Sequence, residues 1–299
     1  MESIEELQKR YKLSANDSDF IYQIIFEELT KGKKEKIKHC NLILGQQGSG
    51  KSTFSEKLSE KKGNAVVING DFIRGHHPDI VELLKLYPNE YCYIIHPDWQ
   101  AWKTKLIADL IKKGYEFNLE GACSDIEYIK AQIKELKKAR YTVDPYILAV
   151  HFIESRLRML ERFCRQIMSS GTGRINDHER NQTCYDNITE MIRDLDLDRI
   201  QSLFLVDSSL ISYPVSKSCE QKELLLQTIR TMNLTQTFQS FTSRINGIVQ
   251  FLQANQGEIS PALNERSTAQ IFQLREDFAN SIRIELARSN HFFRLDKSR

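Results

Sequence analysis

The chain has 299 residues, of which 40% are hydrophobic, and its 42 basic and 40 acidic residues leave a formal net charge of +2. This length suits one large or two modest domains, and the balanced charge counts against a broad basic surface for nucleic acid. Because the chain has no apolar run of the ~20 residues that span a membrane, no N-terminal signal region and six scattered cysteines without metal-ligand spacing, we expect a cytoplasmic protein with no membrane partner.

The N-terminal part, residues 1–38, predicts a helical extension. Its apolar residues share one helical face: Phe20, Ile21, Ile24, Ile25 and Leu29. From residue 39 onward apolar strands alternate with helices, which predicts an α/β fold with a doubly wound parallel sheet and helices on both faces. Five strands are predicted, at residues 40–45, 65–70, 116–120, 145–150 and 200–206.

Helices are predicted between these strands. We expect Asp98 to be the N-cap of a helix that Gly114 ends, and further helices at about 125–138, 152–168 and 178–195. Residues 220–299 contain only two glycines and one proline and read as helices throughout. The predicted organisation is an N-terminal helical extension at 1–38, a core at 39–218 and a C-terminal helical region at 219–299.

The segment from Gly45 to Ser52, GQQGSGKS, matches the phosphate-binding loop pattern G-x-x-x-x-G-K-[ST]. It lies between an apolar strand and a helix, where backbone N–H groups and the helix N-terminus can bind phosphate oxygens. In this pattern Lys51 reaches the β- and γ-phosphates, and the Ser52 hydroxyl binds Mg²⁺. We therefore predict ATP and Mg²⁺ as cofactors, with a nucleotide site formed by Gly45, Gln46, Gln47, Gly48, Ser49, Gly50, Lys51, Ser52 and Thr53.

Acidic residues follow two of the predicted strands, at Asp71 and Glu120. Since ligands of a doubly wound sheet gather outside the carboxyl ends of its strands, both carboxylates are expected beside the nucleotide. Asp71 could accept the proton of an acceptor hydroxyl, or it could only cap the following helix. Glu120 could orient Mg²⁺-bound water or contact the acceptor, with a structural cap as the alternative. Arg74 and His77 are further candidates for contacting the acceptor.

Phosphoryl transfer needs cations that neutralise the charge developing on the γ-phosphate. The predicted helix at 152–168 carries Arg158 and Arg162 one turn apart and so on one face. Arg174 follows two glycines in a loop suited to a lid that closes over a nucleotide. Arg162 and Arg174 are therefore predicted to act in catalysis with Lys51 and Asp71.

Four local matches make the chain resemble the zeta toxin family of P-loop kinases over about residues 27–195. They are Gly45–Ser52, Asn69–Pro78, Gly114–Gly121 and the helix around Arg162 with the loop at Arg174. Members of this family are bacterial toxins that phosphorylate UDP-N-acetylglucosamine on its sugar 3′-hydroxyl. The resemblance implies that Asp71 is the base, that Lys51, Arg162 and Arg174 stabilise the phosphoryl group, and that Ser52 holds Mg²⁺. It also implies a partner, either a helical antitoxin or a self-inhibitory segment of this chain.

The resemblance is weaker on the acceptor side. Glu120 corresponds to the family's acid at the end of the third strand, but Lys103-Thr104 stands where an acid is expected to contact the sugar nucleotide. Ala122 and Ser124 stand where the family pattern favours Thr and Arg. We therefore expect a kinase acting on a small nucleotide-type acceptor, a UDP-N-acetyl sugar first, with another nucleotide sugar or a nicotinamide-type dinucleotide as alternatives.

Two other functions remain open from the sequence. A polynucleotide-end kinase shares the phosphate-binding loop and a strand-end aspartate, but the near-neutral charge counts against a nucleic-acid partner. A nucleotide-dependent binding module, without transfer activity, would use ATP to set a conformation that the helical tail reports to a partner.

Overall fold

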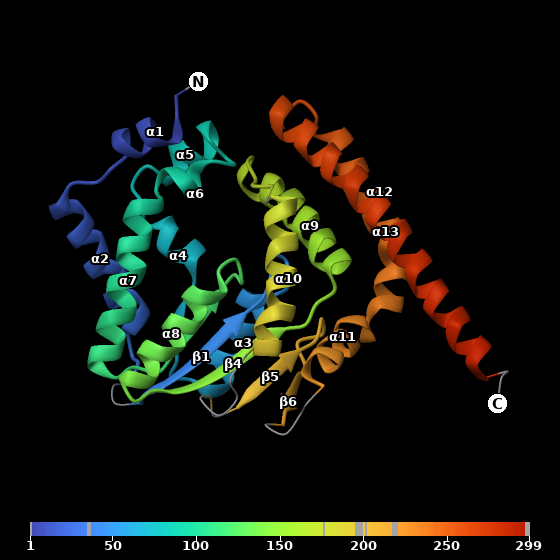
Figure 1. The fold of residues 1–299 in the computed structure, drawn as a ribbon. Coiled ribbons are helices and arrows are strands. Elements are labelled where there is room, and N and C mark those ends of the chain that lie inside the picture. The colour runs from blue at the N-terminus through green and yellow to red at the C-terminus, as the bar shows by residue number, and fades with distance from the viewer. Residues whose placement is uncertain are drawn as a thin grey trace.

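A central sheet runs through the computed structural model, which describes residues 2–34, 37–175, 177–194, 200, 202–216 and 221–296 (Figure 1). Within these residues the sheet has six strands in the order β2-β3-β1-β4-β5-β6. Five strands are parallel, and the sixth pairs antiparallel with β5. The strands are β1 (His39–Leu44), β2 (Val66–Ile68), β3 (Phe117–Gly121), β4 (Thr142–Leu148), β5 (Leu203–Val206) and β6 (Ser212–Val215).

The α/β fold with a mostly parallel sheet is confirmed, with strand boundaries shifted from the predicted ones. The antiparallel strand β6 was not predicted, because it is short and contains Pro214, which cannot donate to a ladder. Pro214 lies opposite Phe204 at the edge of the sheet, where proline is tolerated.

Helices cover both faces of the sheet because strand side chains alternate between the faces. On one face Ile43 and Tyr146 pack with Phe54 of α3. On the other face Leu42 and Val143 belong to the main core, to which several helices contribute. The helices of this arrangement are α2 (Ala15–Thr30), α3 (Lys51–Lys62), α7 (His96–Lys113), α8 (Ile126–Lys138), α10 (His178–Asp194) and α11 (Lys222–Met232).

Shorter helices complete the N-terminal half of the molecule. They are α1 (Ile4–Arg10), α4 (Gly70–Gly75), α5 (Ile80–Leu86) and α6 (Tyr91–Ile94). In a small core of their own, Leu7 of α1 packs with Leu83 and Ile94. The N-terminal extension is therefore helical, as predicted, and it packs on the elements that follow β2.

The helix α7 begins at His96 with a proline in its first turn, so the prediction that Asp98 is its N-cap is wrong. The fixed φ of proline suits the first turn of a helix, which moves the start upstream. Asp98 lies within that turn, where the helix dipole favours a carboxylate. Its Oδ2 is 3.8 Å from Nε2 of His77.

The C-terminal helices form a second core against α9 (Phe152–Ser170). The helices α12 (Leu234–Ala254) and α13 (Pro261–Asp296) lie alongside each other (Figure 1), and the rings of Phe241 and Phe278 stack with centroids 3.7 Å apart. The residues of α9 buried in this core are Ile153, Leu157, Leu160, Phe163, Cys164 and Ile167.

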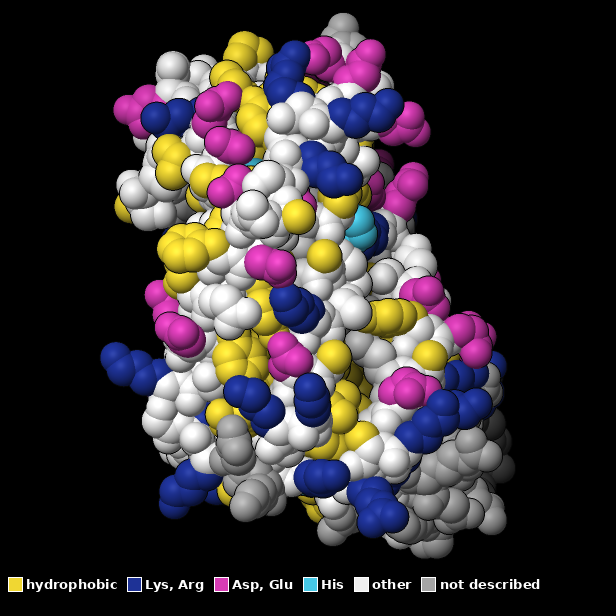
Figure 2. Space-filling model, turned by 90° about the vertical axis from the view of Figure 1, so that its left-hand side faces the viewer, with side chains coloured by type: hydrophobic (Ala, Val, Ile, Leu, Met, Phe, Trp, Pro, Cys, Tyr) yellow, Lys and Arg dark blue, Asp and Glu magenta, His cyan; other side chains and the backbone are white. Residues whose placement is uncertain are grey.

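The surface on the side of α2 and α7 mixes basic and acidic side chains (Figure 2). One exposed ion pair there joins the two helices, with Lys105 Nζ 2.8 Å from Asp19 Oδ1. Among the described residues, none of the helices has the length and apolar character that crossing a membrane requires.

Candidate phosphotransfer site

A cleft of about 1470 Å³ opens outside the carboxyl ends of β1 and β3. Residues of α4, α6 and α7 form one wall, and residues of α9 and α10 form the other. The predicted site residues that line the cleft are Gln47, Gly48, Gly50, Lys51, Ser52, Thr53, Asp71, Arg74, Glu120, Arg162 and Arg174. Four predicted residues, each within the described part of the chain, do not line it: Gly45, Gln46, Ser49 and His77.

Two glycines give the phosphate-binding loop its shape. Gly48 has a φ of 75° and Gly50 a φ of 96°, conformations that residues with a Cβ avoid. A Cβ at Gly48 would also lie 2.0 Å from the backbone oxygen of Ser155, so the loop packs directly against α9. Gly50 immediately precedes α3, and the loop therefore ends at a helix N-terminus, where phosphate groups are bound favourably.

The side chain of Lys51 contacts its own loop. Its Nζ donates hydrogen bonds to the backbone oxygens of Gly45 at 2.8 Å and of Gln46 at 2.9 Å. Burial lowers the pKa of this ammonium from its usual 10.5. The Gln46 side chain donates to the backbone oxygen of Val150 at 2.7 Å. Gln46 therefore connects the loop to the segment that follows β4, and it does not line the cleft.

Ser52 and Glu120 meet at the floor of the cleft, where the Ser52 hydroxyl donates to Glu120 Oε2 at 2.9 Å. The other carboxylate oxygen, Oε1, is buried and has no hydrogen-bond partner among the described residues. Burial raises the pKa of Glu120 from its usual 4.5, although the Ser52 hydrogen bond and the Lys51 ammonium oppose the shift.

These two oxygen donors fit a hard cation. Mg²⁺ binds proteins through one or two oxygen ligands and completes its shell with water and phosphate, and the orphaned Glu120 oxygen lies next to the predicted ligand Ser52. The described residues contain no cluster of three or more His, Cys, Asp or Glu side chains that could hold a metal ion by themselves. A cation here would therefore complete its shell with water and with oxygens of a bound phosphate.

Asp71 lies in the first turn of α4, but it is not the cap of that helix. The cap is Asn69, whose side chain accepts from the Asp71 backbone N–H at 2.8 Å. The Asp71 carboxylate pairs through Oδ1 with Arg74. Desolvation by the surrounding protein raises the pKa of Asp71. The guanidinium groups of Arg74, Arg174 and Arg162 outweigh this effect and hold that pKa below its usual 3.8. Asp71 is therefore ionised at neutral pH.

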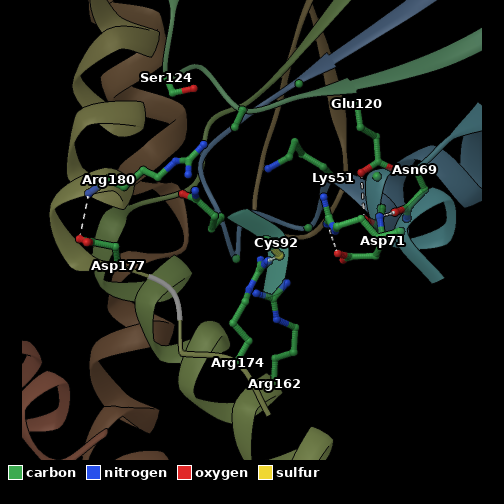
Figure 3. A pocket seen from close by; sticks show the side chains of 18 of the residues that line it. Lys51, Asn69, Asp71, Cys92, Glu120, Ser124, Arg162, Arg174, Asp177 and Arg180 are labelled. Carbon is green, nitrogen blue, oxygen red and sulfur yellow. Dashed lines mark hydrogen bonds and ion pairs between the residues drawn. The ribbon is translucent and has the colours of Figure 1, made fainter. Parts of the chain in front are cut away.

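Arg162 of α9 and Arg174 of the following loop extend side by side into the cleft (Figure 3). Arg174 donates to Sγ of Cys92 at 2.6 Å, and its backbone N–H donates to the Gln166 side chain at 3.1 Å. Nε of Arg162 is buried without a hydrogen-bond partner in the described part of the chain. Both guanidinium groups lower the pKa of Asp71, so the cleft brings these three side chains together.

Arg158 also lines the cleft, but its charge is balanced by the protein. It pairs with Glu154 at 2.6 Å and donates to the backbone oxygen of Ser208 at 3.0 Å. Arg244 of α12 contacts the same Glu154 at 2.7 Å and Glu161 at 2.6 Å. This network connects α12 with α9 and leaves Arg158 a weaker candidate than Arg162 for contacting phosphate.

His77 lies away from the cleft, with only 1% of its surface exposed. Its Nδ1 accepts from the backbone N–H of Asp79 at 3.3 Å, and its ring lies 6.4 Å from that of Trp102. Because α4 is a short helix, the chain turns into the core directly after it and takes His77 along. The structure therefore places His77 in the turn after α4 and not among the residues that line the cleft.

Several cleft residues lacked a signal in the sequence: Cys92, Tyr93, His96, Trp99, Gln100, Arg165 and Arg180. They come from different helices and meet only when those helices pack. Lys103, which departs from the family pattern on the acceptor side, lines the same cleft. In the sequence, only the helical spacing of positions 96, 100 and 103 indicated that these three side chains share one face of a helix.

Comparison with known proteins places this site in a family. A family profile described as Zeta toxin matches residues 26–211, which is more than half of the chain. Toxin zeta of Enterococcus hirae is 32% identical over 139 residues, which cover 46% of this chain and 49% of that protein. Toxin PezT of Streptococcus pneumoniae is 27% identical over 194 residues, which cover 62% of this chain and 77% of that protein. The chain thus spans about half the length of the Enterococcus hirae relative.

A solved structure from the characterisation of the PezAT chromosomal toxin–antitoxin system of Streptococcus pneumoniae is also similar. It has a TM-score of 0.70 and 21% sequence identity, over 79% of this chain and 98% of that chain. Similarity at this level of identity shows a shared fold, and the predicted P-loop kinase fold is confirmed. Since the family profile covers more than half of its length, the chain belongs to the Zeta toxin family.

Proposed function

We propose that the chain is a kinase that transfers the γ-phosphate of ATP to a hydroxyl of a small nucleotide-type acceptor. The observation that carries this proposal is the meeting of three features in one cleft: a phosphate-binding loop, the ionised Asp71, and the pair of Arg162 and Arg174. A phosphate-binding loop by itself is compatible with any nucleotide-binding protein. An ionised carboxylate with one oxygen available, and two arginines beside it, suit transfer.

In the proposed reaction the acceptor hydroxyl lies against Oδ2 of Asp71, because Arg74 contacts Oδ1. The hydroxyl oxygen forms a bond to the γ-phosphorus while the bond from that phosphorus to the bridging oxygen breaks and ADP leaves. The hydroxyl proton passes to Asp71. The transition state of phosphoryl transfer is loose and develops little charge on the attacking oxygen, so a carboxylate of lowered pKa is a sufficient acceptor.

Positive charge for the transferred group comes from Lys51, Arg162 and Arg174 in this proposal. The Lys51 ammonium lies within hydrogen-bond distance of the loop carbonyls, from which it can turn to phosphate oxygens. Ser52, with Glu120 close by, would hold Mg²⁺, which would supply further neutralisation of the phosphates when bound.

For the acceptor we propose a UDP-N-acetyl sugar as the first candidate, supported by membership of the Zeta toxin family. For the partner we propose an antitoxin, since the similar solved structure comes from work on a toxin–antitoxin system. We further propose that residues 39–218 form the catalytic unit, with 1–38 and 219–299 as helical additions to it.

The test is phosphoryl transfer measured by mass spectrometry, with ATP and a panel of nucleotide sugars, dinucleotides and a 5′-hydroxyl oligonucleotide. Asp71→Asn should lower kcat by about 10³-fold or more while ATP affinity changes less than threefold. Asp19→Asn, at an exposed position of α2, is the matched control. If Asp71→Asn turns over at the wild-type rate, Asp71 is not the base. A labelled oligonucleotide would support a polynucleotide-end kinase, and tight ATP binding with no product would support a binding module.

A further inference from the structure

A polar stripe on α7 forms part of the acceptor side of the cleft. His96, Gln100 and Lys103 line the cleft, and their spacing places them on one helical face. One and two turns further along this face, Leu106 and Leu110 are fully buried in the main core. Lys103 therefore occupies the position at which α7 passes from the open cleft into the apolar interior.

The charge of Lys103 is not balanced by a direct contact. Its ammonium makes no hydrogen bond or ion pair with any described residue, and burial, followed by the nearby Arg74 guanidinium, lowers its pKa from 10.5. Two neighbouring cations of the cleft differ in this respect, because Arg74 pairs with Asp71 and Arg158 pairs with Glu154. A partly desolvated ammonium without a partner is costly, and an anionic ligand would remove that cost.

Lys103 belongs to the acceptor side of the cleft. The charged groups that act on it are Arg74, the partner of Asp71, and Glu120. The phosphate-binding side has its own cations in Lys51 and Arg162. An anion bound by Lys103 would therefore lie near the hydroxyl that receives the phosphoryl group.

We propose that Lys103 selects an acceptor whose sugar carries an anionic group, a carboxylate or a phosphate, close to the accepting hydroxyl. This inference rests on the proposed kinase function and narrows its acceptor class. Lys103 acts as a specificity determinant, since it contacts the non-reacting part of the acceptor. A charge-assisted hydrogen bond to the ammonium holds the anion and leaves the chemistry at Asp71 unchanged.

The experiment compares pairs of acceptors that differ only in this group. UDP-glucuronate against UDP-glucose tests a carboxylate, and NADP+ against NAD+, which differ by one ribose phosphate, tests a phosphate. In at least one pair, kcat/KM of the wild-type protein should favour the anionic member by about 10- to 100-fold. Lys103→Met should abolish the preference and Lys103→Glu should reverse it. Lys105→Met, on the outer side of the same helix, should leave it unchanged.

The outcomes separate this proposal from the kinase function. Transfer without a preference for either anionic member, or a preference that survives Lys103→Met, would overturn the role of Lys103 while the kinase stands. If Lys103→Met lowers kcat/KM equally for UDP-glucuronate and UDP-glucose, Lys103 contacts the diphosphate that both share, and the proposal is overturned. If no acceptor is phosphorylated, calorimetric Kd values for UDP-glucuronate and UDP-glucose decide the matter: equal affinities reject the proposal, and a Lys103-dependent difference supports it.

Discussion

The hydroxyl of Ser52, in the first turn of α3, donates a 2.9 Å hydrogen bond to Glu120 at the end of β3. This contact joins the phosphate-binding loop to the neighbouring strand. It also holds a partly buried carboxylate whose second oxygen is itself buried and has no partner among the described residues. The site therefore contains a charge that costs the protein stability.

Glu120→Gln should stabilise the protein at neutral pH while lowering activity. Burial raises the pKa of Glu120 above 4.5, so the folded state favours the protonated carboxyl, and ionisation destabilises it as pH rises through the folded-state pKa. The Tm advantage of Glu120→Gln should be present at pH 7, should shrink as pH falls through the folded-state pKa, and should be lost below pH 4.5. Thermal unfolding across pH checks this, with Glu60→Gln on the exposed side of α3 as control. A constant Tm difference at all pH values would contradict it.

Gly48→Ala should damage the phosphate-binding loop far more than an ordinary glycine substitution does. The new Cβ would meet the backbone oxygen of Ser155 at 2.0 Å, in addition to the strain of a positive φ. Gly63→Ala is the matched control, because Gly63 has the same φ of 75° and nothing within 4 Å of its Cβ position. Strain alone should cost Gly63→Ala about 1 kcal/mol.

In urea unfolding, Gly48→Ala should lower the free energy of unfolding by about 2 kcal/mol or more beyond the decrease measured for Gly63→Ala. In calorimetry it should also lose ATP binding. Equal destabilisation of the two variants would show that α9 moves away without cost.

Arg244→Met should destabilise the fold by about 2 to 3 kcal/mol. The substitution removes contacts of 2.7 Å to Glu154 and 2.6 Å to Glu161. It leaves Glu154, which is largely buried, with one ion-pair partner, Arg158, and a hydrogen bond from the Thr237 hydroxyl. Arg193→Met removes an exposed pair with Glu223 and should cost only about 0.5 kcal/mol. Denaturant midpoints measure both losses, and similar values for the two variants would show that the network contributes no more than a surface pair.

Arg174→Gln should lower kcat by about 10²- to 10³-fold with little change in KM for ATP. Under the proposed function its guanidinium acts on charge that develops only in the transition state. Steady-state kinetics provides the measurement, and Arg283→Gln on α13 is a control far along the C-terminal helix. A rise in KM at constant kcat would instead assign Arg174 to ground-state binding.

Sequence patterns predicted the parts of the site that belong to one strand–loop–helix unit or to the end of a strand. The loop from Gly45 to Ser52, together with Asp71 and Glu120, could be placed because parallel strands deliver their carboxyl ends to one edge. Cys92 and Arg180 could not be placed, because they reach the cleft only through the packing of helices. His77 was misplaced because residues next to a site residue in sequence can still turn into the core.

The helix α9 has two functional sides, with Arg162 in the cleft and an apolar side that α12 and α13 cover. Unfolding of the hairpin that α12 and α13 form would expose that apolar side of α9 to water. This hairpin and α9 should therefore unfold as one cooperative unit. Amide hydrogen exchange in α9 and α12 should then share one opening free energy. A chain that ends before α12 would consequently lose the cover of α9. Its kinase activity would reflect the altered folding of α9 first, and the removal of an inhibitory segment only second.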